Sequence, residues 1–76
     1  MIDSVKAWGH DEIYDYCRAH ATTDITTAGE MLGLGRTKSH ELYGAGQFPV
    51  PVLVFGPQSY RVPTAPLLRL LGLAAD

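Results

Sequence analysis

The sequence lacks a second cysteine, a large excess of either charge and a long uninterrupted apolar run. The single cysteine, Cys17, excludes an internal disulfide, and no Cys-x-x-Cys spacing suggests a structural zinc site. The longest uncharged stretch, residues 42–60, is interrupted by glycines and prolines, so it is not expected to cross a bilayer as a helix. The first residues show no basic start followed by an apolar segment, which argues against a signal peptide. These absences predict a reduced, soluble, cytoplasmic protein that does not contact a membrane.

The length of 76 residues predicts one small domain, residues 1–76. A composition of 46% hydrophobic and 18% charged residues is typical of a globular chain and not of a disordered one. A chain this short buries only about 60% of its unfolded surface, so its stability is marginal. We therefore expect the fold to depend on a small apolar core or on a partner.

The charges are unevenly distributed along the chain. Residues 1–32 carry two cationic and six acidic side chains, a net charge of −4. Residues 33–75 carry four cationic side chains and one acidic one, a net charge of +3. Asp76 adds the last negative charge, and the total is −2. A basic second part indicates an anionic partner for that part of the chain.

A first helix is predicted from about His10 to His20. Its apolar face repeats at i, i+3, i+4 and i+7, through Ile13, Tyr16, Cys17 and His20. Cys17 is expected to be a small core residue, and Trp8 is expected to fold back onto the same face. The polar residues 21–24 are interpreted as the connection to the next element, so residues 1–24 form an N-terminal helix and linker.

A helix-turn-helix unit is predicted over residues 25–46. Its first helix begins at Thr27, because Thr27-Ala28-Gly29-Glu30 fits the capping box. Gly33 and Gly35 favour a tight turn after that helix. The second helix begins at Arg36 with Gly35 as its N-cap and ends by Gly44 to Gly46. Its inner face is expected to consist of Ser39, Leu42 and Tyr43.

A β-hairpin and a last helix complete the expected α+β fold. The β-branched run 49–55 predicts an edge strand, residues 56–59 a turn, and residues 60–63 a return strand. The hairpin, with its approach, occupies residues 47–63. Thr64 is expected to cap a C-terminal helix over residues 64–73, whose leucines are packed on most sides.

The sequence offers little for catalysis. No nucleophile, base and orienting group stand in a motif spacing, and the three histidines form no i, i+4 pair. We therefore expect no enzymatic activity, no metal and no cofactor. Arg36, Thr37, Lys38 and His40 remain on the outer face of the second helix of the helix-turn-helix. In such units the N-terminal turns of that helix enter the major groove of DNA.

Further motifs extend this interpretation. In chain order they are Thr27-Ala28, Leu32-Gly33-Leu34-Gly35-Arg36, Leu42, Gly46-Gln47-Phe48-Pro49, Gly56 and Tyr60-Arg61-Val62-Pro63 before a leucine-rich helix. In this order and spacing, the stretch from about residue 25 to residue 71 resembles the excisionase and MerR-like winged helix-turn-helix family. The resemblance implies that residues 36–41 face the major groove and that the hairpin is a wing along the minor groove or backbone. The residues it implies in DNA binding are Thr27, Arg36, Thr37, Lys38, His40, Glu41, Gln58, Ser59 and Arg61.

Two positions differ from the family pattern. The turn of the hairpin is uncharged, where family members often carry several basic residues, and His40 stands where a tyrosine is common. Because phosphate neutralisation supplies most of the non-specific binding energy, we expect a modest affinity for each single copy.

The family implies a sequence-specific protein that binds double-stranded DNA, with an excisionase of a phage or integrative element as the first interpretation. A small MerR-like transcriptional regulator is the alternative within the family. A protein-interaction module, in which Trp8 and the leucine-rich end contact a partner without DNA, is the alternative from another class. The expected partners are double-stranded DNA, an integrase and further copies of the chain on DNA.

Overall fold

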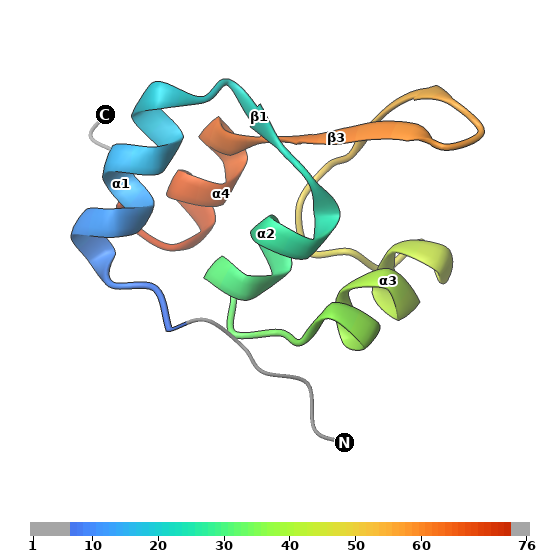
Figure 1. The fold of residues 1–76 in the computed structure, drawn as a ribbon, viewed down its shortest axis with the longest axis horizontal. Helices are drawn as coiled ribbons and strands as arrows, with labels where there is room; N and C mark the ends of the chain where they lie inside the picture. The colour runs from blue at the N-terminus through green and yellow to red at the C-terminus, as the bar shows by residue number, and fades with distance from the viewer. Residues whose placement is uncertain (1–6, 74–76) are drawn as a thin grey trace.

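The computed structural model describes residues 7–73, which form four helices and a three-stranded antiparallel sheet (Figure 1). The elements in chain order are α1 His10–Ala19, β1 Thr22–Thr23, α2 Ile25–Met31, α3 Arg36–Gly44, β2 Leu53–Gly56, β3 Ser59–Pro63 and α4 Thr64–Leu70. The predicted α+β class is confirmed. None of the helices in this part of the chain is long and apolar enough to cross a membrane.

The sheet has the strand order β1-β3-β2, so β3 is central and β2 lies at an edge. Thr22 pairs with Pro63 and Thr23 pairs with Val62. The prediction that residues 21–24 are only a connection is therefore wrong for Thr22 and Thr23. A segment of two residues is too short to show the alternation of side chains that identifies a strand. β1 forms because the backbone of Thr22 and Thr23 pairs with the edge of β3 that β2 leaves open.

The edge strand β2 is shorter than the predicted run 49–55. Pro49 and Pro51 have no N–H group to donate to a ladder, so regular pairing begins only at Leu53. Val50 lies outside the sheet and is buried in the core, with 5% of its surface exposed. The return strand β3 begins at Ser59, one residue earlier than predicted.

The core lies where α1, α2, α4 and the inner end of β3 meet. Its buried apolar side chains are Ile13, Cys17, Ile25, Ala28, Met31, Val50, Val62 and Leu67. The predicted burial of Cys17 is confirmed, and desolvation raises the pKa of its thiol. In Figure 1, α1 and α4 lie together at one end of the molecule, whereas α3 and the hairpin lie at the other end. None of these core side chains belongs to α3, so α3 lies at the margin of the core.

Trp8 folds back onto α1, as predicted. Its ring meets the ring of Tyr16 edge to face, with 5.5 Å between the centroids. The indole Nε1 also donates a hydrogen bond to Glu30 Oε1 at 3.4 Å. Trp8 therefore joins the start of α1 to α2.

The start of α2 differs from the prediction. The helix begins at Ile25, and its N-cap is Asp24, whose carboxylate accepts a hydrogen bond from the Thr27 backbone N–H at 3.2 Å. Thr27 is the third residue of the helix, so the predicted capping box of Thr27 and Glu30 is wrong. Burial alone raises the pKa of Asp24, but hydrogen bonds from Thr27 and Thr23 outweigh it and leave that pKa below its ordinary value.

Thr64 also plays a different part from the predicted cap. It is the first residue of α4, after the N-cap Pro63. Its hydroxyl lies 2.6 Å from the carbonyl oxygen of His20 and 3.1 Å from that of Ala21, to which it donates. Thr64 is thus bonded to the end of α1 and not to its own helix. The expectation that the leucines of α4 are packed on most sides fails at Leu70, which is 52% exposed.

Candidate nucleic-acid interface

The helices α2 and α3 cross in very close contact at Gly29 and Ser39. Both residues are buried, and Ser39 is 0% exposed. A Cβ atom placed on Gly29 would lie 2.7 Å from the Ser39 Cβ and would collide with the Ser39 Oγ. The Ser39 hydroxyl is turned back to donate to the Gly35 carbonyl oxygen at 2.8 Å. This crossing was not predicted, because its only local signal in the sequence is a glycine inside a helix.

The predicted tight turn between the two helices is confirmed. Gly33 has φ +83°, the left-handed conformation that glycine adopts most readily. Its N–H donates to the Glu30 carbonyl oxygen, and the Leu34 N–H donates to the Gly29 carbonyl oxygen at 2.8 Å. This pair of bonds is the Schellman motif, which fixes the direction in which the chain leaves α2 and enters α3.

The outer face of α3 carries the predicted polar side chains. Arg36, Thr37, Lys38, His40 and Glu41 are all exposed, whereas Ser39 between them is buried. Within residues 7–73 neither the Arg36 side chain nor the Lys38 side chain forms a hydrogen bond or an ion pair. Four of the exposed side chains surround a wide, shallow hollow of about 450 Å³. The structure therefore brings Arg36, Thr37, His40 and Glu41 together around one open hollow, and Lys38 is exposed on the same helix outside it.

His40 and Thr26 connect this face to α2. The His40 ring Nε2 lies 3.2 Å from the Thr26 hydroxyl, within hydrogen-bond distance. Thr27, which the resemblance selected, is half-buried, and its backbone N–H is bonded to Asp24. The α2 side chain that reaches the outer face of α3 is therefore Thr26, which the sequence analysis did not select.

The hairpin of β2 and β3 extends beyond the helical part of the molecule (Figure 1). Its tight turn consists of Pro57 and Gln58, and Gln58 and Ser59 are exposed there. The ring of Tyr60 stacks on the ring of Tyr43 from α3, with 4.5 Å between the centroids. This stack fixes the hairpin relative to α3.

Arg61 is exposed and Val62 is 0% exposed, so successive side chains of β3 alternate between solvent and core. The guanidinium is not free, however. Its Nε donates to the Thr22 hydroxyl at 3.2 Å and its Nη2 lies 3.4 Å from the Thr22 carbonyl oxygen. Arg61 therefore lies across the outer side of β1, away from the tip of the hairpin where Gln58 and Ser59 lie.

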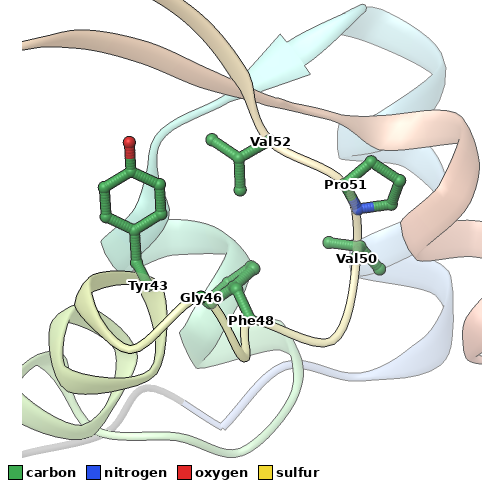
Figure 2. A pocket seen from close by; sticks show the side chains of 6 residues that line it. All are labelled: Tyr43, Gly46, Phe48, Val50, Pro51 and Val52. Atoms are coloured by element: carbon green, nitrogen blue, oxygen red, sulfur yellow. The ribbon is translucent and has the colours of Figure 1, made fainter.

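An apolar pocket of about 260 Å³ lies between α3 and the chain that leads to β2. Figure 2 shows Tyr43 on one side of it and residues from the connecting loop on the other. The lining residues are Tyr43, Gly46, Phe48, Val50, Pro51 and Val52. Apart from the Tyr43 hydroxyl these side chains offer no group for proton transfer or metal binding, so the pocket suits an apolar group.

The acidic side chains of α1 lie apart from the cations of α3, whereas Arg69, from the basic second part of the chain, lies on α4 beside α1. The acidic side chains Asp11, Glu12 and Asp15 are exposed on α1, at the opposite end of the molecule from α3 (Figure 1). Among residues 7–73 no three His, Cys, Asp or Glu side chains are grouped to hold a metal ion. An anionic partner is therefore attracted to the α3 end and repelled from the α1 end.

The comparisons with known proteins add no relative to these observations. No protein-family model matches the chain, and neither curated proteins nor solved structures give a significant match.

Proposed function

We propose that this protein binds double-stranded DNA, with α3 in the major groove and the β2–β3 hairpin as a wing beside it. The observation that carries the proposal is the exposed face of α3. Arg36 and Lys38 stand there without a partner among the described residues, in the first turns of the second helix of a helix-turn-helix. Cationic and hydroxyl donors at this position meet phosphates and base edges in the major groove.

The packing of α3 supports the same proposal. The close contact of Gly29 with Ser39 and the stack of Tyr43 on Tyr60 hold α3 near its middle and near its C-terminal end. A helix held in this way presents its outer side chains in a fixed arrangement, as base recognition requires. The resemblance to the excisionase and MerR-like family points to an excisionase of a mobile element, or to a small transcriptional regulator.

The salt dependence of binding tests the proposal. Because residues 33–75 carry four cationic side chains, each copy makes few phosphate contacts. We expect log K to fall with log salt with a slope of roughly −2 to −4 per monomer, at about −0.9 per neutralised phosphate. A fluorescence anisotropy titration of a short duplex at several salt concentrations measures the slope. A slope near −8 per monomer would show a basic surface that this account lacks, and no binding at low salt would contradict the proposal.

Arg61→Ala tests the part played by the wing. The substitution removes one cation and its two hydrogen bonds to Thr22. If the guanidinium also contacts phosphate, the variant binds all duplexes more weakly by a similar factor, and the salt slope becomes shallower by about one. Thr22→Val is the matched control, because it removes the Thr22 hydroxyl and leaves the cation in place. Equal affinity and slope for Arg61→Ala and the parent would remove Arg61 from the interface.

An interaction module without DNA is the second candidate, and the apolar surface of the hairpin favours it. Leu53, Val54 and Phe55 are 43%, 62% and 68% exposed. Large exposed apolar side chains in a group mark contact sites for other macromolecules. The two candidates differ in which substitutions matter, since loss of the α3 cations abolishes DNA binding and leaves an apolar contact intact.

A further inference from the structure

The outer edge of β2 is open to solvent. β2 is the last strand of the sheet, and β3 pairs only with its inner edge. Along such an edge, alternate residues direct unpaired N–H and C=O groups outward, where another strand can pair with them. In β2 the pairing register with β3 shifts between Val54 and Gly56, so the regular part of the edge is Leu53 and Val54. The edge is also apolar, because Leu53, Val54 and Phe55 are 43–68% exposed.

Charge does not protect this edge. Sheet edges in monomeric proteins usually carry lysine or another charge that prevents pairing with a second chain. Here residues 42–60 contain no Asp, Glu, Lys or Arg at all, so two copies of β2 can approach without repulsion between like charges. The residues of β2 themselves offer no ion pair to a charged polypeptide, so an uncharged apolar strand suits this edge better.

We propose that β2 pairs antiparallel with β2 of a second copy of this chain, across a two-fold axis. Identical strands suit this arrangement, because each copy then offers the same backbone groups and the same apolar side chains to the other. Val52, the residue before β2, lines the apolar pocket beside α3 (Figure 2). We call Leu53, Val54 and Phe55 the wing surface.

The size of the wing surface sets the strength of this dimer. At the stated exposures, three such side chains present on the order of 300 Å² per copy, since a large side chain buries about 150–250 Å² in full. Successive side chains of a strand point to opposite faces, so pairing of two edges buries less than about 600 Å² of these side chains, under half of what a stable interface needs. The proposal is therefore a weak dimer, with a Kd between about 10 μM and about 1 mM.

Sedimentation equilibrium without DNA tests the proposal, so its failure is distinguishable from failure of DNA binding. We expect the weight-average mass to rise from 8.3 kDa toward twice that value as the protein concentration is raised to about 1 mM. Val54→Lys should remain monomeric, because the dimer would place two ammonium groups close together. Leu70→Lys is the matched control on α4, where Leu70 is 52% exposed, and it should associate like the parent.

Amide chemical shifts give a second reading on the same samples. In the parent and in Leu70→Lys, the signals of residues 53–56 should move with concentration, and in Val54→Lys they should not. Equal thermal unfolding of the three proteins shows that each one folds. A parent that is monomeric at about 1 mM overturns the proposal. Equal association of Val54→Lys and Leu70→Lys also overturns it. So does a weight-average mass that rises beyond that of a dimer without reaching a plateau.

Discussion

Gly29→Ala is expected to destabilise the protein more than any other single-methyl change at a described glycine. The new Cβ would lie 2.7 Å from the Cβ of Ser39, and both helices would have to move apart. Overpacking of this kind costs about 1–3 kcal/mol, which is a large part of the stability of a domain of this size. Urea unfolding followed by circular dichroism measures the loss as a lower midpoint with an unchanged slope.

Two variants make this prediction specific to the crossing of α2 and α3. Gly44→Ala is the control, because a Cβ on Gly44 meets no atom within 4 Å and Gly44 has no positive φ. It should raise stability by about 0.4–1 kcal/mol. Ser39→Gly, combined with Gly29→Ala, removes the atoms that collide, so the double variant should be more stable than the sum of the single effects. A Gly29→Ala protein as stable as Gly44→Ala would contradict the close crossing.

Replacing the cations of α3 is expected to give the largest change in DNA binding. Arg36→Ala should cost about 1–3 kcal/mol on a preferred sequence and relax the preference at one position. Lys38→Ala should weaken binding to all sequences to a similar extent if its ammonium meets a phosphate. Both side chains are exposed, so the variants should unfold at the temperature of the parent.

Arg69→Ala provides the matched control for these two substitutions. Arg69 is an exposed arginine in the last turn of α4, which packs beside α1 at the end of the molecule opposite α3 (Figure 1). Its removal changes the net charge by the same amount as removal of Arg36. If anisotropy titrations show equal losses for Arg69→Ala and Arg36→Ala, the effect is one of overall charge and α3 is not the reading helix.

The start of α2 shows where local sequence patterns reach their limit. Asp24 and Thr27 are both good N-cap residues, but only Thr27 is followed three residues later by a glutamate, so the local pattern favours Thr27. Packing decides in favour of Asp24. A helix that begins at Ile25 adds this side chain, 1% exposed, to the buried stripe of Ala28 and Met31.

The start and end of α3 could be predicted because their signals are local. Gly35 has extended backbone at the N-cap, and Gly46 has φ +70° after the last turn. The contacts of Gly29 with Ser39, of Thr64 with His20 and of Thr22 with Arg61 join residues far apart in the chain. Periodicity and capping signals contain no information about such pairs, so only the folded structure shows them.

The candidate site was predictable to a different degree in its two parts. The polar face of α3 follows from helical spacing once the inner face is known, and the structure places the predicted side chains on one exposed surface. The wing surface does not follow from sequence, because an apolar β-branched run is as typical of a buried strand as of an exposed one. Exposure of Val54 and Phe55 depends on how far the hairpin extends beyond the core.

Selection of duplexes from a random pool, followed by titration at one fixed low salt concentration, tests the central claim most directly. If α3 reads base edges, the protein should bind a selected duplex at least about 10³-fold more tightly than a scrambled duplex of equal length and composition. Arg36→Ala should lose part of that ratio, and Arg69→Ala should keep it. Equal affinity of the parent for the selected and scrambled duplexes, or no binding to either, would contradict the account.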